Sequence, residues 1–209
     1  MTTLKEMPPG EKYALTMANM KLAQSFAVDF AREHISEEAV EELREIWRQG
    51  VAPIPDAATD AEKYEIAYRN WAWVAKNNFR FVRRHMGREG LATFIRADVE
   101  ALKREYENAS LRLLALVRAV APGLAFSMTM SRMVYQLQWL TPFSVAEPEK
   151  NTVVCSIPRC KVLDYDGMED VCEIGCQVAY PTWTAEQFKV KMSPVPRGHS
   201  CVVTLTPIR

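Results

Sequence analysis

Cysteine is the residue type whose spacing in this chain points most directly to chemistry. All five cysteines of the 209-residue chain lie between positions 155 and 201. An odd number of clustered thiols, in a chain that begins without the apolar core of a signal peptide, favours metal binding or catalysis over a disulfide framework. The five are Cys155, Cys160, Cys172, Cys176 and Cys201.

Four of the cysteines form two close pairs. Cys172 and Cys176 are four residues apart, which places both thiols on one face of a helix, with about 5–6 Å between Cβ atoms. Cys155 and Cys160 flank a Pro-Arg step that bends the chain, and Arg159 would favour a neighbouring thiolate by its charge. Each pair could therefore present two sulfurs to one metal, one cluster or one redox reaction.

Three interpretations remain open for this stretch: a metal or iron–sulfur site, a catalytic thiol, or packing alone. We favour an iron–sulfur cluster of the 4Fe–4S type, because cluster ligands are spaced more widely and variably than the Cys-x2–4-Cys ligands of zinc. Zinc is the alternative metal. The predicted metal ligands are Cys160, Cys172, Cys176 and Cys201, with Cys155 as a further cofactor-binding candidate. Cys155, on an apolar strand, is also the cysteine that core packing alone would explain.

Other polar residues near the cysteines are candidates for supporting roles. His199 precedes Cys201 by two residues and could be a metal ligand, a base or a turn residue. An acidic stretch between the cysteine pairs is either close to a bound metal or a solvated face. It contains Asp164, Asp166, Glu169, Asp170 and Glu173.

Apolar residues recur at spacings of three and four over roughly two-thirds of the chain, which predicts helices. Ser36 is an expected N-cap, and Thr59 with Glu62 is a capping-box pattern. The helix over 60–86 carries six aromatic residues and is apolar on two faces, as in a buried or dimer-forming helix. The helices are expected over residues 11–34, 37–47, 60–86, 91–108, 110–120 and 124–140.

Beyond Pro142 the sequence is typical of short strands around one short helix, which carries Cys172 and Cys176. Strands are expected over 151–156, 187–192 and 201–206, the helix over 168–179, and turns at 166–167 and 194–198. The predicted class is α+β: an N-terminal helical bundle over 1–145, then a cysteine-rich lobe over 146–209 with a small antiparallel sheet, packed on the bundle as one structural unit.

Composition excludes several functional classes. Lys plus Arg equals Asp plus Glu at 26 each, so no net field would attract nucleic acid or anionic lipid. No apolar run approaches the roughly 20 residues that span a bilayer. We expect a cytoplasmic protein that binds neither nucleic acid nor membrane, whose partner is a small-molecule ligand or substrate.

The C-terminal third resembles a known family. Its order is Arg159-Cys160, a helix ending in Cys176, the segment 188–192 (FKVKM), and Gly198-His-Ser-Cys201-Val-Val. This order is similar to the C-terminal half of the L-2-amino-thiazoline-4-carboxylic acid hydrolase-like family. The ending is also similar to the ligand-binding domains of the vinyl-reductase type.

The resemblance implies a ring-opening hydrolase that acts on a carbon–nitrogen bond of a cyclic amidine. In that interpretation Cys176 or Cys201 is the nucleophile, and His199 or Glu173 carries the proton. A third hypothesis is a non-enzymatic ligand-binding or dimerisation module, with a homodimer formed through the aromatic helix 60–86.

Overall fold

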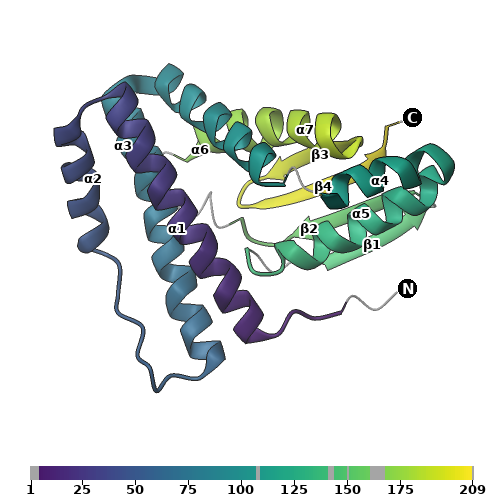
Figure 1. Ribbon diagram of the computed structural model, residues 1–209, viewed down its shortest axis with the longest axis horizontal. Coiled ribbons are helices and arrows are strands. Elements are labelled where there is room, and N and C mark those ends of the chain that lie inside the picture. Colours follow the sequence, from purple (N-terminus) through teal and green to yellow (C-terminus); the bar gives the residue numbers. More distant parts are fainter. Residues whose placement is uncertain (1–4, 107–108, 141–143, 150, 161–167, 209) are drawn as a thin grey trace. The chain divides into compact units, whose positions relative to one another are not determined.

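The computed structural model describes residues 5–106, 109–140, 144–149, 151–160 and 168–208 (Figure 1). Helices fill the chain up to Leu137, and a four-stranded antiparallel sheet follows. The predicted α+β class is therefore confirmed. The chain divides into a helical unit, mainly Met7–Phe94, and a sheet unit, mainly Ile95–Asp164 and Glu169–Arg209. The expected domains 1–145 and 146–209 stay a prediction.

The helical unit contains α1 (Pro9–His34), α2 (Glu37–Arg48) and the first part of α3 (Asp60–Tyr106). Both expected N-terminal caps are present. The Ala39 N–H donates to Ser36 Oγ at 3.2 Å. The Thr59 N–H donates to the Glu62 carboxylate at 2.8 Å, and the Glu62 N–H donates to Thr59 Oγ1 at 3.4 Å. These side chains satisfy amide donors that the first helical turns leave open.

A buried amide ties the three helices together. Trp47 Nε1 donates to Asn78 Oδ1 at 2.9 Å, and Asn78 Nδ2 donates to the Ala23 carbonyl at 3.1 Å. Such a bond fixes register, because a buried amide left unpaired is costly.

Half of the aromatic residues of the 60–86 segment form a ladder along α3. The rings of Tyr64 and Tyr68 have centroids 6.0 Å apart, and those of Tyr68 and Trp71 are 5.7 Å apart. All three side chains are half-buried. The homodimer through this segment stays a prediction.

The expected link between two helices at residues 87–90 is wrong in its extent. Only Gly87 leaves the helical conformation, with φ 67° and ψ −166°, and α3 continues on both sides of it. Glycine adopts this backbone without the steric cost that a Cβ imposes. The interruption is therefore one residue long.

The sheet unit pairs a helical hairpin with the sheet. The hairpin consists of α4 (Ala109–Val120) and α5 (Pro122–Leu137), and Pro122 begins α5 at its first position. The strands are β1 (Ser144–Glu149), β2 (Thr152–Ile157), β3 (Val190–Arg197) and β4 (Ser200–Pro207), in the spatial order β1-β2-β4-β3.

Register assigns the two faces of the sheet. On β2 and β4, Val153 lies opposite Leu205, Cys155 opposite Val203, and Ile157 opposite Cys201. This face, called here the core face, packs against α5 through Phe126, Met130 and Val134. The other face, called here the open face, carries the intervening residues of each strand.

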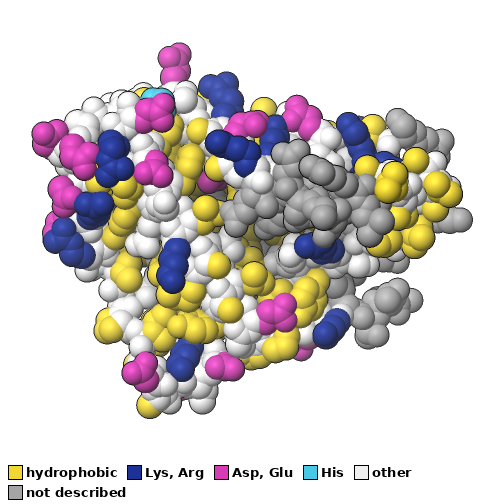
Figure 2. Space-filling view, viewed as in Figure 1, with side chains coloured by type: hydrophobic (Ala, Val, Ile, Leu, Met, Phe, Trp, Pro, Cys, Tyr) yellow, Lys and Arg dark blue, Asp and Glu magenta, His cyan; other side chains and the backbone are white. Residues whose placement is uncertain are grey.

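Several large apolar side chains of the hairpin are exposed. Figure 2 shows hydrophobic side chains gathered on the surface where α4 and α5 lie. The exposed members on these two helices are Leu116, Val120, Leu124, Met128 and Leu137.

The helix that carries Cys172 and Cys176 is longer than expected. It runs as α6 (Glu169–Val171), η1 (Cys172–Ala179), α7 (Tyr180–Trp183) and η2 (Thr184–Phe188), where η1 and η2 are π-helical. In the wide turn the Tyr180 N–H donates to the Gly175 carbonyl, five residues back. Pro181 lacks an N–H, and the π-helical bonding accommodates it inside the helix.

One predicted strand and one predicted turn need correction, and one strand was missed. The strand expected over 187–192 begins only at Val190, because the helix runs to Phe188 and Lys189 turns left-handed at φ 54°. The turn expected over 194–198 is confined to Gly198 and His199, with Gly198 at φ 60°. Pro194 and Pro196 lie in β3, an edge strand, where a missing N–H costs little. β1 has no alternating pattern that could have predicted it. The expected turn at 166–167 lies outside the described residues.

Candidate functional site

Cys160 and Cys201 meet at one end of the sheet. Cys201 stands near the start of β4, opposite Ile157 at the end of β2. Past that end, the Cys160 backbone N–H donates to the carbonyl of His199 in the β3–β4 turn. This bond holds the segment after β2 against the turn that precedes Cys201.

The π-helix supplies the other two thiols. Cys172 is the first residue of η1, and Cys176 lies near its middle. Four residues are slightly less than one turn of a helix bonded five residues back, so both thiols share a face, as the sequence predicted. π-helical turns are rare and are often found at functional sites.

The pKa of Cys176 responds to the other three cysteines of this region. Burial raises the pKa of this thiol, and Cys172, Cys160 and Cys201 raise it further, to about 12. Such electrostatic effects act only over short distances in a protein. Three separate segments of the sheet unit therefore bring their thiols together, and we call Cys160, Cys172, Cys176 and Cys201 the four-thiol group.

Cys172 and Cys201 show the same coupling. Burial raises the pKa of Cys172, and Cys160 and Glu173 add to the rise. Burial also raises the pKa of Cys201, with Cys160 and Cys172 adding to it. A thiolate at any of these positions is destabilised by its neighbours unless a cation compensates.

Hydrogen bonds to two of the sulfurs lower the pKa values of their thiols. Gln177 Nε2 donates to Cys172 Sγ at 3.8 Å and lowers the pKa of that thiol. A backbone hydrogen bond from Val195 lowers the pKa of Cys201. Donors aimed at sulfur are a feature of thiolate ligands in metal and cluster sites.

Cys155 has different surroundings from the four-thiol group. It lies on the core face, in the apolar cluster with Val153, Val203 and Leu205. Burial alone raises its pKa, to about 11, and no other thiol contributes. The structure thus brings together four of the five predicted cofactor ligands and places Cys155 among core side chains.

The predicted proton carriers lie at the edge of this region. His199 is exposed in the turn, where its backbone carbonyl accepts from Cys160. Glu173 is exposed and its charge acts on Cys172. Arg159 is also exposed.

The acidic stretch is only partly described. Glu169 is exposed and Asp170 is buried at 9% exposure. Asp164 and Asp166 lie outside the described residues. Within the described ranges, no three His, Cys, Asp or Glu side chains lie close enough together to hold a single metal ion.

Two titratable residues beside the group were not predicted. Asp98, on the part of α3 that belongs to the sheet unit, has its pKa raised to about 6 by burial. Burial raises the pKa of Tyr180 well above its usual value, and Asp98 and Cys176 raise it further. Asp98 occupies an ordinary place in an amphipathic helix, so no sequence pattern marks it. Arg197 and Ser156 were also missed, and they line a hollow discussed below.

Comparison with known proteins adds no family to this geometry. No protein-family model matches the chain, and no curated protein matches it. The resemblance to the thiazoline-carboxylate hydrolases stays an expectation. Among the described residues, no helix combines the length and apolar character needed to cross a membrane.

Proposed function

We propose that this chain carries a cysteine-ligated metal site, with an iron–sulfur cluster favoured over zinc, held by Cys160, Cys172, Cys176 and Cys201. The observation that carries the proposal is the convergence of these thiols from three separate segments. We also propose that the protein works in the cytoplasm, where thiols stay reduced.

The chemistry of the donors supports a bound cation. Each thiol of the group with a shifted pKa is raised by at least one other thiol, so ionising several of them together is unfavourable in the bare protein. A cationic metal or cluster reverses this repulsion, because thiolates are its ligands. The four thiols are therefore better suited to bind a cationic metal group together than to be ionised side by side without one.

The spacing favours a cluster over one zinc ion. Cluster ligands are spaced more widely and variably than zinc ligands, and four thiolates around a 4Fe–4S cluster enclose a larger object than one ion. When bound, such a cluster would supply one-electron transfer. The residues of the chain would hold it, donate to its sulfur ligands through Gln177, and shield it by the buried faces of the π-helix and β4.

A cysteine nucleophile is less well supported. A thiol with a pKa of about 12 is ionised in only about one molecule in 10⁵ at pH 7. Reactive cysteines instead have a lowered pKa next to a cation or a helix N-terminus. The hydrolase interpretation of Cys176 with His199 or Glu173 stays a prediction.

The test is metal analysis of the full chain purified without oxygen and, in parallel, reconstituted with ferrous iron and sulfide. We expect about four irons and about four sulfides per chain, with visible absorption that bleaches on reduction. Zinc at about one per chain would keep the site and replace iron as its metal. A colourless, folded and metal-free protein from both preparations would refute the proposal.

Two matched variants locate the metal. Cys176→Ala should lose nearly all bound metal, because it removes the thiol that interacts with the other three. Cys155→Ala removes another thiol of the same unit, one whose pKa burial also raises, and should keep the metal. Equal metal content in the two variants would contradict the assignment of ligands.

A further inference from the structure

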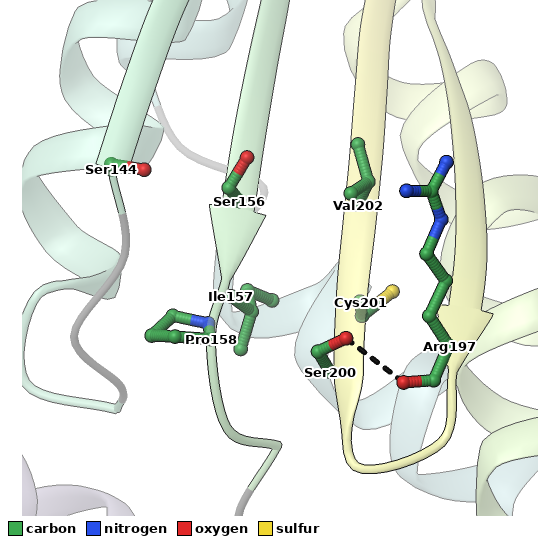
Figure 3. A pocket seen from close by; sticks show the side chains of 8 residues that line it. All are labelled: Ser144, Ser156, Ile157, Pro158, Arg197, Ser200, Cys201 and Val202. Atoms are coloured by element: carbon green, nitrogen blue, oxygen red, sulfur yellow. Dashed lines mark hydrogen bonds between the residues drawn. The ribbon is translucent and has the colours of Figure 1, made fainter.

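A hollow of about 400 Å³ lies in the sheet unit at the end of the strands where Cys201 stands (Figure 3). Parts of all four strands line it, together with the residue after β2. Its size falls within the range of small-molecule sites. Neither the metal proposal nor the sequence patterns account for it.

The register places the polar lining on the open face of the sheet. Ser144 of β1 lies opposite Ser156 of β2, and Ser156 lies opposite Val202 of β4. Arg197 of β3 lies opposite Ser200. In Figure 3 the Arg197 side chain runs along its strand toward the level of Val202, and the Ser144 and Ser156 hydroxyls lie at that level on the other side.

Among the described residues that line the hollow, Arg197 carries the one charge, and it is positive. Arg197 is exposed, and within the described part of the chain its guanidinium has no ion pair or hydrogen bond. Its backbone carbonyl accepts from Ser200 Oγ at 2.9 Å, so the Ser200 hydroxyl is used within the turn. No Asp or Glu is part of the lining.

The remaining lining is apolar. Ile157, Pro158 and Val202 supply hydrocarbon between the hydroxyls and the turn. A guanidinium and hydroxyl donors on one side, with hydrocarbon beside them, match a molecule that has an acid group and an apolar body.

We propose that the hollow binds a small organic oxyanion, a carboxylate or a phosphate monoester. The acid group pairs with Arg197 and accepts from the Ser156 hydroxyl, and the apolar body covers Val202 and Pro158. Cys201 also lines the hollow, so the bound molecule lies next to one member of the four-thiol group. The binding itself requires only the sheet and Arg197, and it does not depend on a metal.

The test uses three probes of one shape on the full chain: benzoate, phenyl phosphate and the neutral benzyl alcohol. Titrations are followed by amide NMR shifts and by calorimetry, on protein as purified and after chelator treatment. We expect a Kd on the order of 1 mM for at least one anion, with shifts centred on Ser156 and Val202, and at least ~10-fold weaker binding of the alcohol.

Variants assign the binding to the guanidinium. Arg197→Gln should weaken the preferred anion by about 10- to 100-fold, and Arg197→Lys should lie between that variant and the native chain. Lys191→Gln is the matched control, because it removes a cation from the open face of the same strand outside the hollow. It should change the Kd by less than ~2-fold.

The outcomes separate this proposal from the metal site. A stronger response to benzoate identifies a carboxylate ligand, and a stronger response to phenyl phosphate identifies a phosphate ester. Equal binding of the alcohol, no binding of either anion at about 20 mM, or an equal loss in Lys191→Gln would overturn the proposal. Because chelator-treated protein is titrated as well, absence of a metal leaves the result interpretable.

Discussion

The sheet unit buries cysteine in two regions that differ in their neighbours. In the middle of the core face, Cys155 lies among Val153, Val203 and Leu205, and burial alone raises its pKa. At the end of the sheet, Cys176 has a comparably raised pKa, but other thiols contribute to it. Burial raises the pKa of both cysteines, so the identity of the neighbouring side chains is what distinguishes the two regions.

The two regions also differ in what would make ionisation favourable. Hydrocarbon neighbours cannot compensate a thiolate at Cys155, so this thiol stays neutral as part of the core. At Cys176 the proposed cluster would compensate the charge of the sulfurs that ligate it. The comparison thus predicts that one region depends on a metal and the other depends on packing.

Removing the proposed metal should give the largest loss of stability. The loss should come from the four-thiol group and not from the surroundings of Cys155. Chelator treatment of the native chain should lower the free energy of unfolding by at least ~5 kcal/mol, or roughly 10–20 °C in Tm, because the four thiols lose their shared cation. Calorimetric melting measures the change. The Tm of Cys176→Ala should not fall further on chelation. A native chain whose Tm is unchanged by the chelator would contradict the predicted difference between the two regions.

Truncating the core beside Cys155 should give the next largest effect. Phe126→Ala removes a ring that is 6% exposed and packs on the core face, and it should cost about 3–5 kcal/mol. Leu124→Ala, on the same helix but at 57% exposure, should stay within about 0.5 kcal/mol of the native chain. Denaturant unfolding measures both.

Metal content separates this effect from that of Cys176→Ala. Folded Phe126→Ala protein should keep its metal, since Cys201 is the one member of the four-thiol group that packs against this core cluster and the ring supplies no ligand. Loss of metal in this variant, at a temperature where it is folded, would show that the two regions are not independent.

A pH series should distinguish the two regions by a smaller change in the free energy of unfolding. In chelator-treated protein the folded pKa of Cys155 is about 11 against an ordinary value near 9, so the folded state favours the neutral thiol. The resulting stability is complete below pH 9 and is lost as the pH rises toward 11, at up to ~1.4 kcal/mol per pH unit. Cys155→Ala should remove this share of the slope, while the other thiols with a raised pKa keep theirs, which for Cys176 extends to about pH 12. Parallel native and Cys155→Ala curves between pH 9 and 11 would contradict the assigned shift.

The sequence predicted more of the helices than of the strands, for physical reasons. Helical spacing and caps are local, so α1, α2 and both caps at Ser36 and Thr59 follow from neighbouring residues. Whether a strand tolerates a proline depends on how it pairs with strands that are distant in the sequence. Pro194 was expected in a turn, but it lies in β3, which is an edge strand only because β4 pairs between β2 and β3.

The same limit applies to the site. Clustering along the chain predicted the cysteines, and the i, i+4 spacing predicted the shared face of Cys172 and Cys176. Setting Cys155 apart requires the register, which places it opposite Val203 on the core face. Arg197 was not predicted as a site residue because it was expected in a turn. Only the register of β3 places it in a strand that lines the hollow.

The smallest expected effect concerns the polar contact at the end of the sheet, which Cys155 does not share. Gln177 donates to Cys172 Sγ at 3.8 Å, a long and partly exposed bond. Hydrogen bonds to ligand sulfur stabilise the more negative, reduced cluster. Gln177→Leu should therefore lower the reduction potential while leaving the metal content unchanged, as measured by redox titration of the visible spectrum. Gln138→Leu is the matched control, because Gln138 donates to the Lys5 carbonyl instead of to a sulfur. An unchanged or higher potential in Gln177→Leu would show that this contact does not act on the cluster, and equal shifts in both variants would assign the change to a general effect of the substitution.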